Sequence, residues 1–116
     1  MPLNHVALTV SDRERSAAFY AEHFGLMRRV HEDEHLLIIG SADGSLLALS
    51  DGVPAASGLP RTNHFGFQVG SGDEVRTARE RLRVAGVEET EWQDDHGFVL
   101  VQVVDPDGYR VEFFAH

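Results

Sequence analysis

The chain has 116 residues, with 19 Asp and Glu against 10 Lys and Arg, and it contains no cysteine. A chain of this length forms one domain that buries a real core, and the lack of cysteine excludes disulfide frameworks and thiolate zinc sites. The formal charge of −9 favours cationic or neutral ligands and repels nucleic acid and anionic membranes, so neither of these is an expected partner.

The first half of the chain predicts a strand, a helix and three further strands. The segment PLNHVALTV, residues 2–10, has neither the basic region of a signal peptide nor a membrane-spanning apolar run, so a cytoplasmic location is expected. It leads into SDRE, where Ser11 as N-cap and Glu14 form a capping box, and Gly25 stands where the helix ends. The three strands that follow are predicted in LMRRVHE, HLLIIG and SLLALS, the last two being separated by the turn Asp43-Gly44.

The second half repeats this order after a linker at residues 51–61, which contains two prolines and two glycines. The strand RTNHFGFQV, residues 61–69, leads into a second capping box formed by Ser71 and Glu74, and Gly86 follows the helix. The last three strands are predicted in VEETEW, FVLVQVV and YRVEFF, with the turn Asp105-Pro106-Asp107-Gly108 before the final one.

The two halves are copies of one module. Asn4-His5 can be laid over Asn63-His64 at a shift of 59, which grows to 64 at the last strand. We therefore predict an α+β fold of two βαβββ modules in a single domain spanning 1–116, with module one at 1–50 and module two at 62–116. One such sheet is too small to bury both faces, so pairing the two modules gives one core and one cleft.

Strand parity places His5, His64 and Glu112 on the sheet face away from the helices. Two imidazoles and one carboxylate form a facial triad suited to Fe(II), Mn(II) or related divalent ions that also bind substrate. The alternative is that each histidine bonds a backbone carbonyl and that Glu112 pairs with Arg110, a surface contact worth at most about 1 kcal/mol.

Other polar and aromatic side chains near the last strands are candidates for the same cleft. Glu91, Asp94 and Asp95 are expected in a solvated loop, and they would attract a cationic ligand if they lined the cleft instead. An aromatic wall that suits a planar ligand is expected from Trp92, Phe98 and Phe114.

The segments NHVALTVSD, AAFYAEHFGL, TNHFGFQV and DPDGYRVEFF, in this order, resemble the vicinal oxygen chelate superfamily over essentially the whole chain. This superfamily includes glyoxalase I, bleomycin-resistance proteins and extradiol dioxygenases. The resemblance implies a U-shaped mixed sheet with helices on its outer face and a divalent metal in its cup. By position, His5, His64 and Glu112 are the metal ligands, and Fe2+, Mn2+, Ni2+ and Zn2+ all remain candidates.

The alignment of DGSLLAL with DGYRVEF puts Ala48 over Glu112, so the fourth ligand of glyoxalase I-like members is missing. Three ligands resemble the fosfomycin-resistance and dioxygenase branches, but the acidic segment EETEWQDDHG does not suit a phosphonate. A separate base is needed, and the candidates are His96, Tyr109 and a metal-bound hydroxide; Tyr109 has the wrong parity for the cup.

We therefore expect a metal-dependent enzyme that chelates vicinal oxygens of a small-molecule substrate, with the dioxygenase, lyase, isomerase and transferase types left open. The alternative is a metal-free protein, resembling bleomycin-resistance members, that sequesters a cationic drug. The resemblance also implies a homodimer and leaves open whether both modules of one cup come from the same chain.

Overall fold

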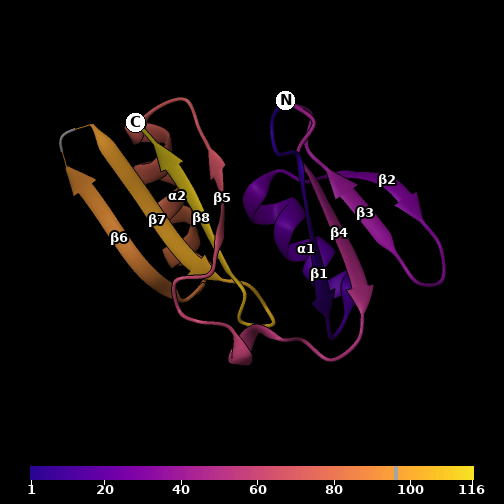
Figure 1. The fold of residues 1–116 in the computed structure, drawn as a ribbon. Coiled ribbons are helices and arrows are strands. Elements are labelled where there is room, and N and C mark those ends of the chain that lie inside the picture. The colour runs from indigo at the N-terminus through magenta and orange to yellow at the C-terminus, as the bar shows by residue number, and fades with distance from the viewer. Residues whose placement is uncertain (96) are drawn as a thin grey trace. The chain divides into compact units, whose positions relative to one another are not determined.

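The structure is a computed structural model that describes residues 1–95 and 97–116. It contains two compact units, Met1–Ser57 and Gly58–His116. Each unit contains a four-stranded sheet and one long helix, and Figure 1 shows the course of these elements. The predicted α+β fold of two βαβββ modules is confirmed. The boundary between the units lies inside the segment 51–61; that both units form one domain, around one U-shaped sheet, stays a prediction.

Unit one contains the strand order β1-β4-β3-β2. Strand β1 runs parallel to β4, and the other pairs are antiparallel. Its elements are β1 (His5–Val10), α1 (Arg13–Phe24), β2 (Arg28–Glu32), β3 (Leu37–Gly40) and β4 (Leu46–Asp51).

Unit two has the equivalent order, β5-β8-β7-β6, again with one parallel pair, β5 and β8. A short 3-10 helix, η1 (Ala56–Gly58), precedes its first strand. The elements are β5 (Phe65–Gln68), α2 (Gly72–Val84), β6 (Glu89–Asp95), β7 (Phe98–Val104) and β8 (Arg110–Ala115).

The two helices begin with different caps. In α2 the predicted cap is confirmed, because the Ser71 hydroxyl accepts a hydrogen bond from the backbone N–H of Glu74 at 3.2 Å. In α1 the prediction of Ser11 is wrong: Asp12 is the N-cap, and its carboxylate accepts from two backbone N–H groups at 3.1 and 3.2 Å. A carboxylate also interacts favourably with the positive end of the helix dipole, while the Ser11 hydroxyl accepts from Arg15.

Each sheet buries one face against its own helix. The alternation of the strands places every second side chain toward the helix, where the aliphatic residues are almost fully buried. In unit one these are Val10, Leu37, Ile39, Leu47 and Leu49, and in unit two Val99, Val101, Val103 and Val111.

The strand pairings support the alignment of the two modules. Ala7 of β1 pairs with Ala48, and the equivalent position in unit two pairs Gly66 with Glu112. Both sheets also contain one β-bulge, between Arg29 and His31 in unit one and between residues 89 and 91 in unit two. The repeat therefore extends to the pairing register and to the irregularity in the edge strand.

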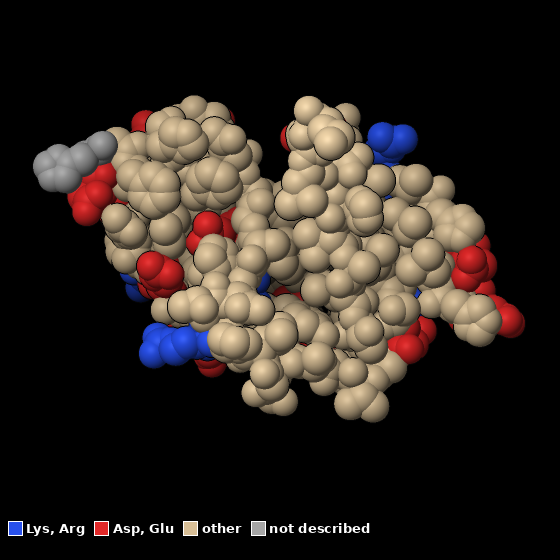
Figure 2. All heavy atoms as spheres, in the orientation of Figure 1, with Lys and Arg blue, Asp and Glu red and all other residues tan. Residues whose placement is uncertain are grey.

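No helix in the described ranges is both long and apolar enough to cross a bilayer. On the face drawn in Figure 2, the basic atoms of the described residues form separate blue groups among acidic red ones.

Candidate functional site

His64 and Glu112 lie together in unit two. Glu112 belongs to β8, which lies between β5 and β7, and His64 immediately precedes β5. The imidazole Nε2 of His64 is 3.6 Å from Oε1 of Glu112, and the exposed fractions of the two side chains are 39% and 11%. The glutamate therefore approaches the histidine from a buried position, on the sheet face away from α2.

Gly66 provides the room for the Glu112 side chain. The two residues are partners in the parallel pair, so a side chain at one position meets the side chain at the other. A Cβ atom placed on Gly66 would lie 2.7 Å from Cγ and 3.2 Å from Oε1 of Glu112. Unit one has alanine at both equivalent positions, where no such conflict arises.

Both histidines have Nδ1 bonded to a neighbouring oxygen. His64 Nδ1 lies 2.8 Å from the backbone carbonyl of Thr62, and His5 Nδ1 lies 3.2 Å from the amide oxygen of Asn4. When Nδ1 carries the proton and donates it, Nε2 presents a lone pair. His64 thus has the carbonyl bond of the non-metal alternative, yet the same bond orients its ring as metal-bound histidines require.

The pKa of the Glu112 carboxyl group is raised, although its surroundings act on it in opposite directions. Burial raises the pKa of its carboxyl group, whereas the charge of His64 and a hydrogen bond from Gln102 lower the pKa, and nearby Glu91 raises it. Arg110, the ion-pair partner of Glu112 in the non-metal alternative, donates to the backbone carbonyl of Arg61. Desolvation disfavours the charged form of a carboxylate in this position, so a cation beside it would be stabilising.

The ligand chemistry fits a divalent ion in part. Two imidazole Nε2 atoms and one carboxylate are the donors of a facial triad, but His5 belongs to unit one, whereas the other two residues belong to unit two. Within residues 1–95 and 97–116, no three His, Cys, Asp or Glu side chains form a group that could hold a metal ion. The observed pair is therefore His64 with Glu112, and the three-ligand site stays a prediction.

Phe98 and Phe114 lie on the same sheet face as Glu112. Gln102 and Glu112 are paired across β7 and β8 and share this face. Phe98 lies four residues before Gln102 and Phe114 lies two residues after Glu112, so both side chains point the same way as these two. Each ring lies near the imidazole of His116, at centroid distances of 6.4 and 6.1 Å. His116 was not expected to take part in this cluster, because a terminal residue carries no strand pattern. Substrate binding by Phe98 and Phe114 stays a prediction.

Trp92 lies on the opposite face, so the expectation that it lines the same cleft is wrong. The Arg79 guanidinium of α2 sits over its indole ring at 4.1 Å, and Trp92 pairs with Val101, a helix-facing residue. The cause is the bulge between Glu89 and Glu91: the extra residue reverses the parity of every later side chain in β6.

The acidic segment of β6 is a strand and not the expected loop. Glu91 pairs with Gln102 and is exposed on the face of Glu112. Asp94 lies toward the helix, where it accepts two hydrogen bonds from Arg76 that lower its pKa. Asp95 pairs with Phe98, so it is exposed on the face of Glu112 as well. Glu91, the partner of Gln102, is the acidic residue that raises the pKa of Glu112. His96, the predicted base, falls outside the described residues.

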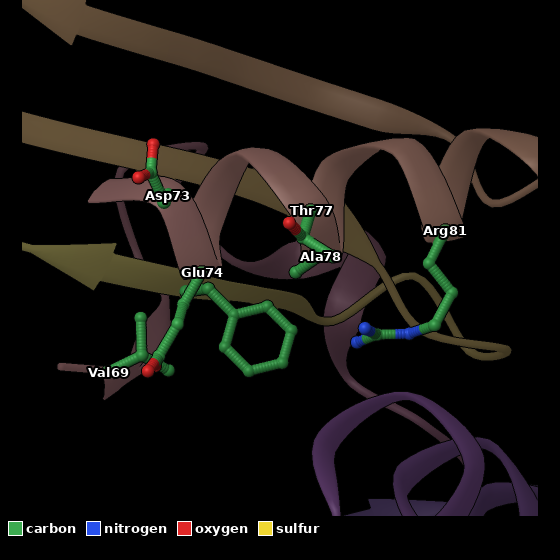
Figure 3. A pocket seen from close by; sticks show the side chains of 7 residues that line it. Val69, Asp73, Glu74, Thr77, Ala78 and Arg81 are labelled. Carbon is green, nitrogen blue, oxygen red and sulfur yellow. The ribbon is translucent and has the colours of Figure 1, made fainter. Parts of the chain in front are cut away.

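A hollow of about 370 Å³ lies along α2, and Figure 3 shows Glu74 and Arg81 pointing to the same side of that helix. Phe113 also lines the hollow. Because Phe113 follows Glu112 directly in β8, its side chain points to the opposite face of the sheet. The hollow is thus separated from the His64–Glu112 pair by the sheet. Its lining residues are Val69, Asp73, Glu74, Thr77, Ala78, Arg81 and Phe113.

Two βαβββ modules, each with one helix and a four-stranded sheet that contains one parallel strand pair, define the class of fold. A model of the Glyoxalase/Bleomycin resistance protein/Dioxygenase superfamily matches residues 2–113. The chain belongs to this superfamily, and the resemblance drawn from its sequence is confirmed.

Individual relatives carry different names. The chain is 31% identical over 114 residues to a "Probable trivalent organoarsenical cleaving enzyme" of Bacillus subtilis, covering 95% of this chain and 77% of that protein. A possible glyoxalase from Bacillus cereus has a similar structure, with a TM-score of 0.78 at 26% identity over 97% of each chain.

The fosfomycin resistance protein FosX of Listeria monocytogenes, solved with Mn(II) and sulfate, has a TM-score of 0.81. That comparison covers 98% of this chain and 89% of the FosX chain at 22% identity, so it shows the fold alone.

Proposed function

We propose that the protein is a divalent-metal-dependent enzyme in which His5, His64 and Glu112 hold the ion. The observation that carries the proposal is the His64–Glu112 pair, with Nε2 and Oε1 3.6 Å apart on a partly buried face. When bound, the metal would act as a Lewis acid toward two oxygens of a small substrate. The Mn(II) in the structure of FosX supports this choice of cofactor.

The chain's own residues prepare such a site in two ways. The bond of His64 Nδ1 to the Thr62 carbonyl directs Nε2 toward the glutamate, and the glycine at 66 leaves space for the carboxylate. Phe98 and Phe114 provide an apolar surface on the same face, suited to the body of a planar substrate. His96 remains the proposed proton acceptor, because the side chains of the other three residues would be occupied by the metal ion.

The ligand residues of this chain do not match the activity named for the Bacillus subtilis relative. Trivalent arsenic is a soft centre that prefers thiolate ligands, and the sequence contains no cysteine. An oxygen-chelating substrate is the better match for a site built from imidazole and carboxylate donors.

A metal-free binding protein for a cationic ligand is the second candidate. Two observations favour it: the net charge of −9 and the carboxylate of Glu91 beside that of Glu112. Such a protein would use the aromatic and acidic groups of the same face without an ion.

Metal content distinguishes the two candidates. Untagged wild-type protein, purified without added metal, should carry one divalent ion per site by mass spectrometry, and His64→Ala should lose it. His35→Ala is the matched control, because that imidazole is exposed and distant in sequence from the pair. No ion in the wild type, together with micromolar binding of a cationic glycopeptide, would support the metal-free candidate.

A further inference from the structure

A second polar residue is buried beside Glu112. Gln102, in β7, is 4% exposed and pairs directly with Glu112 across the two strands. The Thr90 hydroxyl donates to the Gln102 amide oxygen at 2.9 Å, and hydrogen bonding by the Gln102 side chain lowers the pKa of its cross-strand partner, Glu112. A carboxylate only accepts, so the amide N–H group faces Glu112 and the amide oxygen faces Thr90.

Unit one provides an internal comparison for this chain of contacts. The strand pairings align Gln102 with Ile38 and Glu112 with Ala48. At the bulge of the edge strand, Thr90 is equivalent to Val30. All three polar residues of unit two therefore have aliphatic counterparts in unit one.

The comparison indicates that the sheet itself does not require these polar groups. A buried amide is costly unless its hydrogen bonds are satisfied, and unit one forms the same four-stranded sheet with isoleucine at that position. Of the two sheets, the one that contains the Glu112 carboxylate is the one that has Thr90 and Gln102 at these positions. The bulge contributes as well, since it turns Thr90 and Glu91 toward the face of Gln102.

We propose that Gln102, itself held by Thr90, is the positioning residue that fixes the Glu112 carboxylate toward His64 for metal binding. The inference rests on the proposed function. Gln102 does not contact the ion in this proposal; its amide N–H orients one carboxylate oxygen and leaves the other for the ion. Outer-shell partners of this kind typically change metal affinity by about 10- to 100-fold when removed.

The test replaces each polar residue by its counterpart from unit one. Gln102→Ile should weaken Mn2+ binding by about tenfold or more, and Thr90→Val by less, measured as free Mn2+ by electron paramagnetic resonance. Thr90→Ser should bind as the wild type does, because it keeps the hydroxyl. Gln93→Ile is the matched control, since Gln93 is an exposed residue in the neighbouring row of the same face.

Two outcomes would overturn the inference. One is an Mn2+ affinity of Gln102→Ile within twofold of that of the wild type. If Gln102→Ile does not fold, the Mn2+ affinity of Thr90→Val decides, because that substitution exchanges groups of equal size. The other is a crystal structure of either variant in which the Glu112 carboxylate keeps its wild-type position. If the wild-type protein itself binds no Mn2+, the proposed function fails, and the carboxylate position alone decides the role of Gln102.

Discussion

Gly66→Ala is the substitution whose effect follows most directly from the coordinates. The new Cβ would lie 2.7 Å from Cγ of Glu112, and ordinary contact begins at 3.4 Å, so one of the two must move by 0.7 Å (3.4 minus 2.7). Phe114 also restricts the new methyl group, because its Cδ1 would lie 3.3 Å from the same Cβ.

The expected loss of stability is about 1–2 kcal/mol. Overpacking of this kind costs about 1–3 kcal/mol, and the loss of chain entropy in the unfolded state returns about 0.4–1 kcal/mol on replacing glycine by alanine. Urea unfolding followed by the fluorescence of the single tryptophan, Trp92, measures the difference within unit two. Mn2+ binding should weaken in parallel, because the carboxylate is displaced.

Two controls make the result decisive. Gly58→Ala should be nearly neutral, because a Cβ there meets no atom within 4 Å. In a Glu112→Ala background, Gly66→Ala should cost less than half of its effect in the wild type, because the colliding atoms are gone. The reasoning is refuted if the cost is the same in both backgrounds or no larger than that of Gly58→Ala.

Three further predictions concern stability and titration. Asp12→Ala should destabilise the protein by about 1 kcal/mol in urea unfolding as α1 loses its cap, whereas Ser11→Ala should have less than half that effect; equal effects would contradict the assignment of the cap. Arg79→Met should cost about 0.5–1 kcal/mol and shift the tryptophan emission to longer wavelength as the indole loses its cover, and an unchanged spectrum would argue against the stacking. Hydrogen bonds from the His31 side chain and from the backbone N–H groups of His35 and Leu36 lower the pKa of Asp33 from 3.8 to about 2. The stabilising contribution of Asp33 is therefore complete above pH 3.8 and is lost as the pH falls through about 2. His31→Ala should raise this pKa in a nuclear magnetic resonance titration, because the largest of the causes is removed, and no change would count against the bond.

Most of the fold could be predicted because the sequence contains an internal repeat. Matching Asn-His pairs, capping residues and turn glycines marked the two modules, because these features depend on local chemistry that recurs with the sequence. The cap of α1 was misassigned because Ser11 and Asp12 are both suitable residues at adjacent positions, and local sequence does not rank them.

The site was predicted less completely, for reasons of register. Parity placed Glu112, Phe98 and Phe114 on one face, but strict alternation fails after the bulge in β6, and Trp92 is therefore on the other face. Gln102 was missed because FVLVQVV reads as one apolar strand. Its contacts with Glu112 and Thr90 depend on pairing between strands, which a single sequence does not specify.

The location of a bound ion tests the central claim most directly. Crystals of the wild-type protein soaked in Mn2+ should show one anomalous-scattering peak at about 2.0–2.3 Å from Nε2 of His5, Nε2 of His64 and a carboxylate oxygen of Glu112, whichever subunits supply them. A fully occupied peak that lacks any one of the three residues, or no peak beside Glu112, would contradict the account.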